Sequence, residues 1–454
     1  MRRLWTVPLG LVAFTAAAPA QHPPGGSASS NIKLMSHVPL AGPRGGVDIQ
    51  IADIEIEQEL TRPYAYVSRG RRPDGFQVID LRNPGKARVL YSWFIEEPTL
   101  HVGRGVNGKY FKLKGRYYYV QAFQFRKDSP DHDLSVVIMD VTSLPDTTGV
   151  REVGRIRTPQ APGGAHNLFT YKHSDGSTLL FITVESPLPY PYGAHVYDME
   201  RFVAGAPDQG FVGGIPLPEP RGANRGYHDI YVAFEPATGQ DRFYGGGPET
   251  TQLGGNYVYD ITNLRAPKLI AAVITTPSQQ SGGHTFVATP DGRYAVTVMT
   301  SLGLQPLRFF DLKPALDGAV PVVREPIAEW TPDYKKSAHM VEIRWPYAFV
   351  AAYEDGLRVL DMRNPHDPVE VGFYDTFNYR TPFGPLGLEA RGGYGVDIRN
   401  ADGLIVMADG YSGFWAFKMD GFDGWNGHDW GMPNVSSAQD WDHGPEGAPR
   451  RKVS

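Results

Sequence analysis

The feature that most constrains this chain is a short apolar segment ending in aspartate that recurs along almost its whole length. Six copies are clear, and their aspartates stand at positions 80, 140, 198, 260, 311 and 361. The intervals are therefore 60, 58, 62, 51 and 50 residues. A seventh copy, GFWAFKMDG at 413–421, lacks an aspartate at the matching place. Self-similarity at a nearly constant interval indicates a repeat architecture in which each repeat is one supersecondary unit.

Each repeat predicts about four antiparallel strands. An apolar run such as YAFVAAYED precedes the aspartate segment, a third run such as VGFYDTF follows it, and a further segment comes before the pair. Seven such units predict an all-β fold, a seven-bladed β-propeller of four-stranded antiparallel blades that occupies residues 32–420 as one domain. The 52 glycines and 39 prolines among 454 residues fit many short strands joined by turns.

The two ends of the repeat region complement each other. The last unit has no fourth strand, whereas IKLMSHVPLAG at 32–42 resembles a fourth strand with nothing before it. We expect this N-terminal strand to complete the C-terminal blade, which would close the ring and remove exposed strand edges. Residues 421–454 show neither strand nor helix periodicity and are predicted to form a C-terminal extension.

Residues 1–20 are predicted to be a signal peptide. Arg2 and Arg3 precede an apolar stretch at 4–17, and Ala18-Pro19-Ala20 follows as a small-residue cleavage site. We therefore expect an exported protein, periplasmic or extracellular, with no membrane span. The chain has no cysteine, which excludes disulfides and thiolate chemistry. A net charge of −5 gives no sign of nucleic-acid binding.

The motifs VIDLRNP, VYDITNLRAP and VLDMRNPHDP resemble the LVIVD-repeat family, exported or surface proteins that are expected to form β-propellers. The resemblance covers roughly residues 32–420. It implies the fold but no single activity, because one fold carries many functions.

The repeated aspartate is interpreted as structural. It precedes a turn rich in asparagine, proline and arginine, where a carboxylate accepts backbone N–H bonds from its own turn. We expect this role at all six positions, which are Asp80, Asp140, Asp198, Asp260, Asp311 and Asp361.

Histidine is the second repeated residue. The segments GGAHNLF, RGYHDIY, SGGHTFV and SAHMVEI place His166, His228, His284 and His339 at one register, at the start of the innermost strand of blades three to six. At this register we expect Gly46 in blade one and Gly395 in blade seven, while blade two aligns on either His101 or Gly105. Because blades fan around one axis, the four imidazoles should gather there.

Four histidines without cysteine favour a transition metal such as iron, copper or zinc, and we predict these four residues as its ligands. The second strand of each blade ends on the same face of the ring. Among the residues at those ends, Glu185 and Glu354 are predicted to act as acid or base. The other residues there are Arg69, Gln121, Gln124, Glu249, Met299 and Asp409, which are candidates to orient the imidazoles or bind substrate.

Two classes of function remain open. The first is a metal-dependent oxidoreductase or oxygenase acting on a small molecule. The second is a metal-free recognition or surface-assembly module that uses the propeller face, with histidines that only fill space and hydrogen-bond neighbouring blades. A calcium-dependent lactonase-type propeller would need axial carboxylates and asparagines, where this alignment offers histidines. Neither the substrate nor a protein partner can be read from the sequence.

Overall fold

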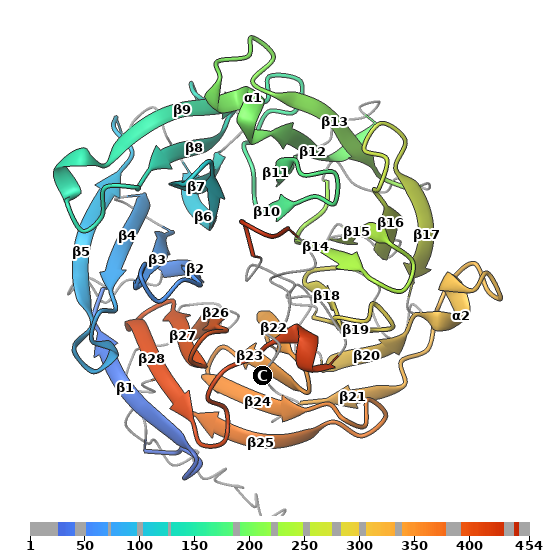
Figure 1. The fold of residues 1–454 in the computed structure, drawn as a ribbon. Coiled ribbons are helices and arrows are strands. Elements are labelled where there is room, and N and C mark those ends of the chain that lie inside the picture. The colour runs from blue at the N-terminus through green and yellow to red at the C-terminus, as the bar shows by residue number, and fades with distance from the viewer. Residues whose placement is uncertain are drawn as a thin grey trace, which may run out of the picture.

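The computed structural model contains seven four-stranded antiparallel sheets arranged around a common centre (Figure 1). It describes residues 26–40, 51–70, 74–97, 103–125, 129–184, 191–218, 226–247, 255–274, 283–298, 306–331, 338–377, 392–430 and 440–444. The predicted seven-bladed β-propeller is confirmed.

Six sheets each consist of four strands that follow one another in the chain, and the seventh combines strands from both ends. In chain order the strands are β1 (Ile32–Val38), β2 (Ile51–Ile56), β3 (Tyr64–Arg69), β4 (Gly75–Asp80), β5 (Arg88–Phe94), β6 (Gly103–Leu113), β7 (Arg116–Phe125), β8 (Leu134–Asp140), β9 (Arg151–Arg157), β10 (Leu168–Lys172), β11 (Thr178–Thr183), β12 (Tyr192–Asp198), β13 (Phe211–Pro216), β14 (Ile230–Glu235), β15 (Gln240–Gly246), β16 (Asn256–Asp260), β17 (Lys268–Val273), β18 (Phe286–Ala288), β19 (Tyr294–Thr297), β20 (Leu307–Asp311), β21 (Ala328–Trp330), β22 (Met340–Arg344), β23 (Tyr347–Ala351), β24 (Leu357–Asp361), β25 (Val369–Tyr374), β26 (Gly393–Arg399), β27 (Leu404–Asp409) and β28 (Gly413–Met419). Short helices accompany them at α1 (Met199–Val203), α2 (Lys313–Leu316), η1 (Pro84–Lys86), η2 (Thr147–Gly149) and η4 (Gly427–Trp430).

The innermost strands form a continuous ring. Each first strand contacts the first strand of the next blade, from β2 through β6, β10, β14, β18 and β22 to β26, which contacts β2 again. Figure 1 shows these strands facing the centre. All six residues of β2 are buried, because a strand here has the axis on one side and neighbouring blades on the others. Side chains on these strands are therefore brought together from distant parts of the sequence.

The last blade contains the N-terminal strand. β1 pairs antiparallel with β28, from Ile32 opposite Met419 to Val38 opposite Phe414. The order of that sheet is β1, β28, β27, β26. Whether this strand is what keeps the ring closed stays a prediction, and a truncation described below tests it.

Aromatic side chains fill the space between blades. Tyr119 of the second blade stacks on Tyr66 of the first, with ring centroids 4.4 Å apart, and lies 4.6 Å from Phe76. Phe181 and Phe243 make a similar contact between the third and fourth blades at 5.9 Å. Large rings bury much apolar area per residue, which explains why a chain without disulfides can hold seven blades together.

The structural role of the repeated aspartates is confirmed. Each one accepts a hydrogen bond from the backbone N–H two residues later, as expected for a turn that follows a strand. The pairs are Asp80 with Arg82 (3.1 Å), Asp140 with Thr142 (3.1 Å), Asp198 with Glu200 (2.9 Å), Asp260 with Thr262 (3.0 Å), Asp311 with Lys313 (3.0 Å) and Asp361 with Arg363 (2.9 Å).

No helix within the described ranges is both long enough and apolar enough to cross a membrane. The predicted signal peptide at 1–20 lies outside the described residues.

Candidate functional site

Four imidazole rings lie side by side just before the inner strands β10, β14, β18 and β22. Ring centroids are 4.1 Å apart for His166 and His228, 3.9 Å for His228 and His284, and 4.7 Å for His284 and His339. We call these four residues the histidine row. The expected gathering of the four imidazoles is thus found, although they follow one another as neighbours in a line. Whether they bind a metal stays a prediction.

Each ring of the histidine row is held through its Nδ1 nitrogen. Nδ1 lies 3.0 Å from Gln124 Oε1 in His166, 3.1 Å from Asp229 Oδ1 in His228, 3.0 Å from Thr285 Oγ1 in His284 and 2.8 Å from the Tyr394 carbonyl in His339. In metal-binding histidines, one ring nitrogen binds the metal while such an acceptor holds the other. The arrangement therefore has the second set of contacts that a histidine metal site requires.

Asp229 is the carboxylate of this site, and its position is fixed from two sides. Asn167 Nδ2 donates to Oδ1 at 2.5 Å, and the Thr285 hydroxyl donates to Oδ2 at 2.6 Å. His284 Nδ1 also lies 3.5 Å from Oδ2. Two histidines from consecutive blades therefore share one carboxylate.

His166, His228 and Asp229 form a compact group. One candidate ligand atom from each residue lies within 4.8 Å of the other two, the only such group of at least three residues among the described histidines and carboxylates. Asp229 is buried and the two histidines are partly buried. Two imidazoles and one carboxylate are a donor set used by iron(II) oxygenases and by catalytic zinc sites.

Burial and neighbouring groups shift the pKa values of two residues in the site, His339 and Asp229. Burial lowers the pKa of His339 well below the usual value, and the neighbouring His284 adds to this effect. Burial alone would raise the pKa of Asp229, but His284, His228 and the Thr285 hydroxyl outweigh it and hold that pKa well below its usual range. At neutral pH the site therefore combines a neutral His339 with an ionised Asp229.

The predicted register was wrong by one residue in blade seven. The His339 ring stacks on Tyr394 at 3.8 Å, and Tyr394 packs against Ala52 of blade one. Gly395 lies one position further, where an added Cβ would stand 2.3 Å from Asp53 Oδ1. A one-residue slip changes the side of a strand on which a side chain lies, and the turn before β26 hides that slip in the sequence.

In blade one, Asp53 of β2 is the residue that faces Gly395. Gly46 itself lies outside the described residues, as do His101 and the predicted catalytic residue Glu185.

Glu354 is half-buried in the turn between β23 and β24. It is the preceding residue, Tyr353, whose ring lies 5.2 Å from that of His339. An acid–base role for Glu354 thus stays a prediction. Gln124, one of the candidate orienting residues, does hold an imidazole, that of His166.

Sequence reasoning missed Asp229 and the polar side chains around it. The residue after each histidine is Asn167, Asp229, Thr285 or Met340, and the first three form one hydrogen-bonded set. The signal was present in GGAHNLF, RGYHDIY and SGGHTFV, where a polar residue follows the histidine. The polar residue directly after each of these three histidines thus belongs to the site as much as the histidine does.

The fold and this site define a β-propeller with a histidine-lined axis. A family model described as "LVIVD repeat" matches residues 337–376, in agreement with the resemblance seen in the motifs. The chain therefore carries an LVIVD repeat in its sixth blade.

Among solved structures, the chain is similar to one titled "Structure of Dos1 propeller". The match has 11% sequence identity and a TM-score of 0.48, and it covers 82% of this chain and 78% of the other. No curated protein matches the sequence.

Proposed function

We propose that this propeller binds one transition metal ion at the histidine end of its axis, through His166, His228 and Asp229, and acts as a metal-dependent oxidoreductase or oxygenase on a small molecule. The observation that carries the proposal is the group of two imidazoles and one carboxylate within 4.8 Å of one another. Iron(II) fits this donor set best, with zinc and copper as the competing metals.

The contacts around the group support this proposal. His166 is held by Gln124 of β7, and Asp229 is held by Asn167 and Thr285 from the two neighbouring blades. Ligands held by second contacts on rigid strands lose little freedom when a metal binds, which favours affinity. His284 lies next to His228 and extends the donor set, and His339 ends the row beside Tyr394.

Metal analysis tests the proposal directly. The protein is purified without a histidine tag, stripped with a chelator, and incubated separately with iron(II) under anaerobic conditions, zinc and copper. We expect close to one metal ion per chain in the wild type. We expect occupancy to fall at least about tenfold in His228→Ala and in Asp229→Asn. His195→Asn is the matched control, because His195 is a buried histidine on β12.

Absence of metal from the wild type after reconstitution would contradict the proposal. It would favour the second class of function, a metal-free recognition or surface-assembly module that uses the propeller face. With metal bound, oxygen consumption by the iron(II) form but not the zinc form would support the oxygenase assignment. Glu354→Gln then tests the predicted acid–base role, since it should lower turnover while metal content stays unchanged.

We further propose that the protein is exported, on the strength of the signal-peptide features in residues 1–20. Determination of the N-terminal residue of the protein recovered from its producing cells tests this. A chain that starts just after Ala20 supports export, and an intact N-terminus within the cytoplasm contradicts it.

A further inference from the structure

A line of polar side chains lies next to the histidine row, formed mainly by the residues that directly follow its histidines in the sequence. It includes Asn107 on β6, Asn167, Asp229 and Thr285, each one blade from the next. Asn107 Nδ2 donates to Asn167 Oδ1 at 2.8 Å, Asn167 donates to Asp229, and Thr285 donates to Asp229 from the other side. Each of these hydrogen bonds is donated in the direction of Asp229, whose carboxylate oxygens accept from both sides. The direction of the whole line is therefore fixed.

The direction of these bonds leaves one acceptor over at the Asn107 end of the line. Because Asn107 uses its amide nitrogen toward Asn167, its Oδ1 oxygen is left as an acceptor, and that oxygen is buried without a hydrogen-bond donor. The next blade around the ring is blade one, where β2 contacts β6. There, Asp53 Oδ2 and Glu55 Oε1 are also buried acceptors without a donor. Three such oxygens on two adjacent inner strands call for an explanation, since buried polar atoms are nearly always satisfied.

The surroundings carry an excess of negative charge. Lys109 Nζ lies 2.7 Å from Glu55 Oε2, and Arg344 lies 3.0 Å from Glu342 and 3.5 Å from Asp397. The buried acids Asp53, Glu55, Glu342 and Asp397 interact electrostatically with the buried bases Lys109 and Arg344, so among these six described residues the acids outnumber the bases by two. Burial raises the pKa of Asp53 to about 7 although Lys109 opposes this effect. Charge buried without compensation is costly, so a cation or protons must balance it.

Space for the Asp53 carboxylate is provided by a glycine. A Cβ added at Gly395 would lie 2.3 Å from Asp53 Oδ1 and 3.1 Å from the Asp53 Cα. Any residue with a Cβ at position 395 would therefore displace the Asp53 carboxylate. The backbone is thus shaped around Asp53 even though Oδ2 of that residue has no donor.

We propose that Asp53, Asn107 and Glu55 form a second cation site on the axis, for a hard cation of the Ca²⁺ class. All three supply oxygen, which hard cations prefer, whereas the histidine row supplies nitrogen, which transition metals prefer. One cation satisfies several acceptors at once and also balances the excess charge. A water molecule would satisfy acceptors but would leave the charge. Its three ligands differ from those proposed for the transition metal, which are His166, His228 and Asp229.

The test uses Ca²⁺ alone as the probe. Protein freed of metals is melted at pH 8 with and without Ca²⁺, with Mg²⁺ and Na⁺ at matched ionic strength, and Ca²⁺ binding is titrated by calorimetry. We expect one Ca²⁺ per chain and a rise in Tm of about 3–6 °C. Asp53→Asn should abolish the rise. Asp241→Asn, which alters a buried carboxylate bonded to Tyr171 and Ser174, should keep it.

Two further results would overturn the proposal. The first is a wild type that shows no heat of Ca²⁺ binding and no change in Tm, while its Tm rises as pH falls below 7; protons then balance the charge. The second is a Ca²⁺ response that disappears in His228→Ala but survives in Asp53→Asn, because Ca²⁺ would then bind at the histidine row. The calorimetric result on the wild type stands even if Asp53→Asn fails to fold. Failure of the transition-metal proposal leaves these outcomes unchanged.

Discussion

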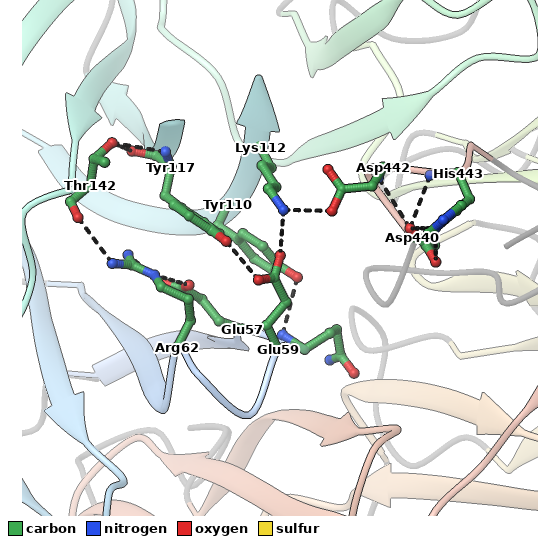
Figure 2. Close-up of polar contacts among 11 residues, drawn as sticks. Glu57, Glu59, Arg62, Tyr110, Lys112, Tyr117, Thr142, Asp440, Asp442 and His443 are labelled. Atoms are coloured by element: carbon green, nitrogen blue, oxygen red, sulfur yellow. Dashed lines mark hydrogen bonds and ion pairs between the residues drawn. The ribbon is translucent and has the colours of Figure 1, made fainter. Parts of the chain in front are cut away.

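The two ends of the propeller axis carry polar side chains of different kinds. At the histidine end, where the inner strands begin, imidazoles surround the carboxylate of Asp229. At the far end, where the inner strands finish, carboxylates face guanidinium and ammonium groups. Arg62 Nε lies 2.8 Å from Glu57, and Lys112 Nζ lies 3.0 Å from Glu59 and 2.6 Å from Asp442 (Figure 2).

Part of the C-terminal extension lies at the far end. Trp441 is buried and contacts the edge of the Tyr110 ring, with centroids 6.2 Å apart. Asp440 accepts backbone bonds from Asp442 and His443 and so fixes the turn that presents Asp442 to Lys112 (Figure 2). The described residues 440–444 therefore pack on the propeller.

The far end has the character of a scaffold, whereas the histidine end has the character of a binding site. Charged side chains at the far end are paired with opposite charges of the fold, and removal of one partner leaves a charge without its pair. Tyr117 donates to Glu59 at 2.6 Å and Arg62 donates to the Val141 carbonyl at 3.0 Å, so side chains of the first two blades are tied together there. The histidine end instead places imidazole nitrogens beside the carboxylate of Asp229, and both kinds of group can bind a transition metal.

The largest effect should come from removal of β1, because both ends of the axis depend on the same seven blades. A chain that begins at residue 41 lacks the strand that pairs with β28. We expect exposed strand edges, aggregation and loss of metal binding. Size-exclusion chromatography and thermal melting measure this, with a chain that begins at residue 26 as the control. A monomer with unchanged melting would contradict the role of β1 in closing the ring.

Arg62→Ala should destabilise the far end of the propeller without changing metal binding at the histidine end. Glu57 would lose its buried partner, and we expect the free energy of unfolding to fall by about 3–5 kcal/mol. Urea denaturation measures the change, and metal content should stay at the wild-type level in the folded protein. The double variant Glu57→Leu/Arg62→Met should recover most of the loss. A change in metal content would show that the two ends are coupled.

Part of the loss of stability at low pH should come from His195, a residue of the scaffold that lies outside the histidine row. Burial lowers the pKa of His195 to about 4, so this ring is neutral in the folded protein and charged in the unfolded chain below about pH 6.5. Its contribution to stability is therefore present above about pH 6.5 and is lost as pH falls toward 4, by up to about 3 kcal/mol.

Denaturation across this pH range checks the His195 prediction. His195→Gln should flatten the profile, and His37→Gln, at an exposed ring stacked on Trp415, should not. An identical profile for His195→Gln and the wild type would assign the acid sensitivity to other groups.

Trp441→Ala tests how firmly the extension is attached. Loss of the buried indole should lower the free energy of unfolding by about 2 kcal/mol, with the metal-binding properties of the histidine end unchanged. Limited proteolysis near residue 440 should become faster in the variant. Equal stability of the two proteins would mean that residues 440–444 contribute nothing to the far end.

The smallest effect is expected at the repeated aspartates. Asp361→Ala removes one turn hydrogen bond and should lower the free energy of unfolding by about 1 kcal/mol. Metal content and turnover should be those of the wild type. Loss of activity at full stability would show that this face of the ring is part of the site.

The sequence by itself determined the repeat and what each repeat forms locally. Asp80 and Asp361 were assigned to turns because a carboxylate after a strand bonds to the backbone two residues away, an interaction contained within four or five residues. The seven blades followed from the interval between those turns. The gathering of His166, His228, His284 and His339 was also predicted, because equivalent positions in a ring of similar blades must meet at the axis.

The tertiary structure decided which atoms meet there. Asp229 joins His228 and His284 only because Asn167 and Thr285 arrive from the blades on either side, 62 and 56 residues away along the chain. Tyr394 rather than Gly395 meets His339, a difference of one residue that turns a side chain to the other side of its strand. Local patterns fix strands and turns, whereas contacts around an axis depend on the register and height of every blade, and these are set only when the ring is complete.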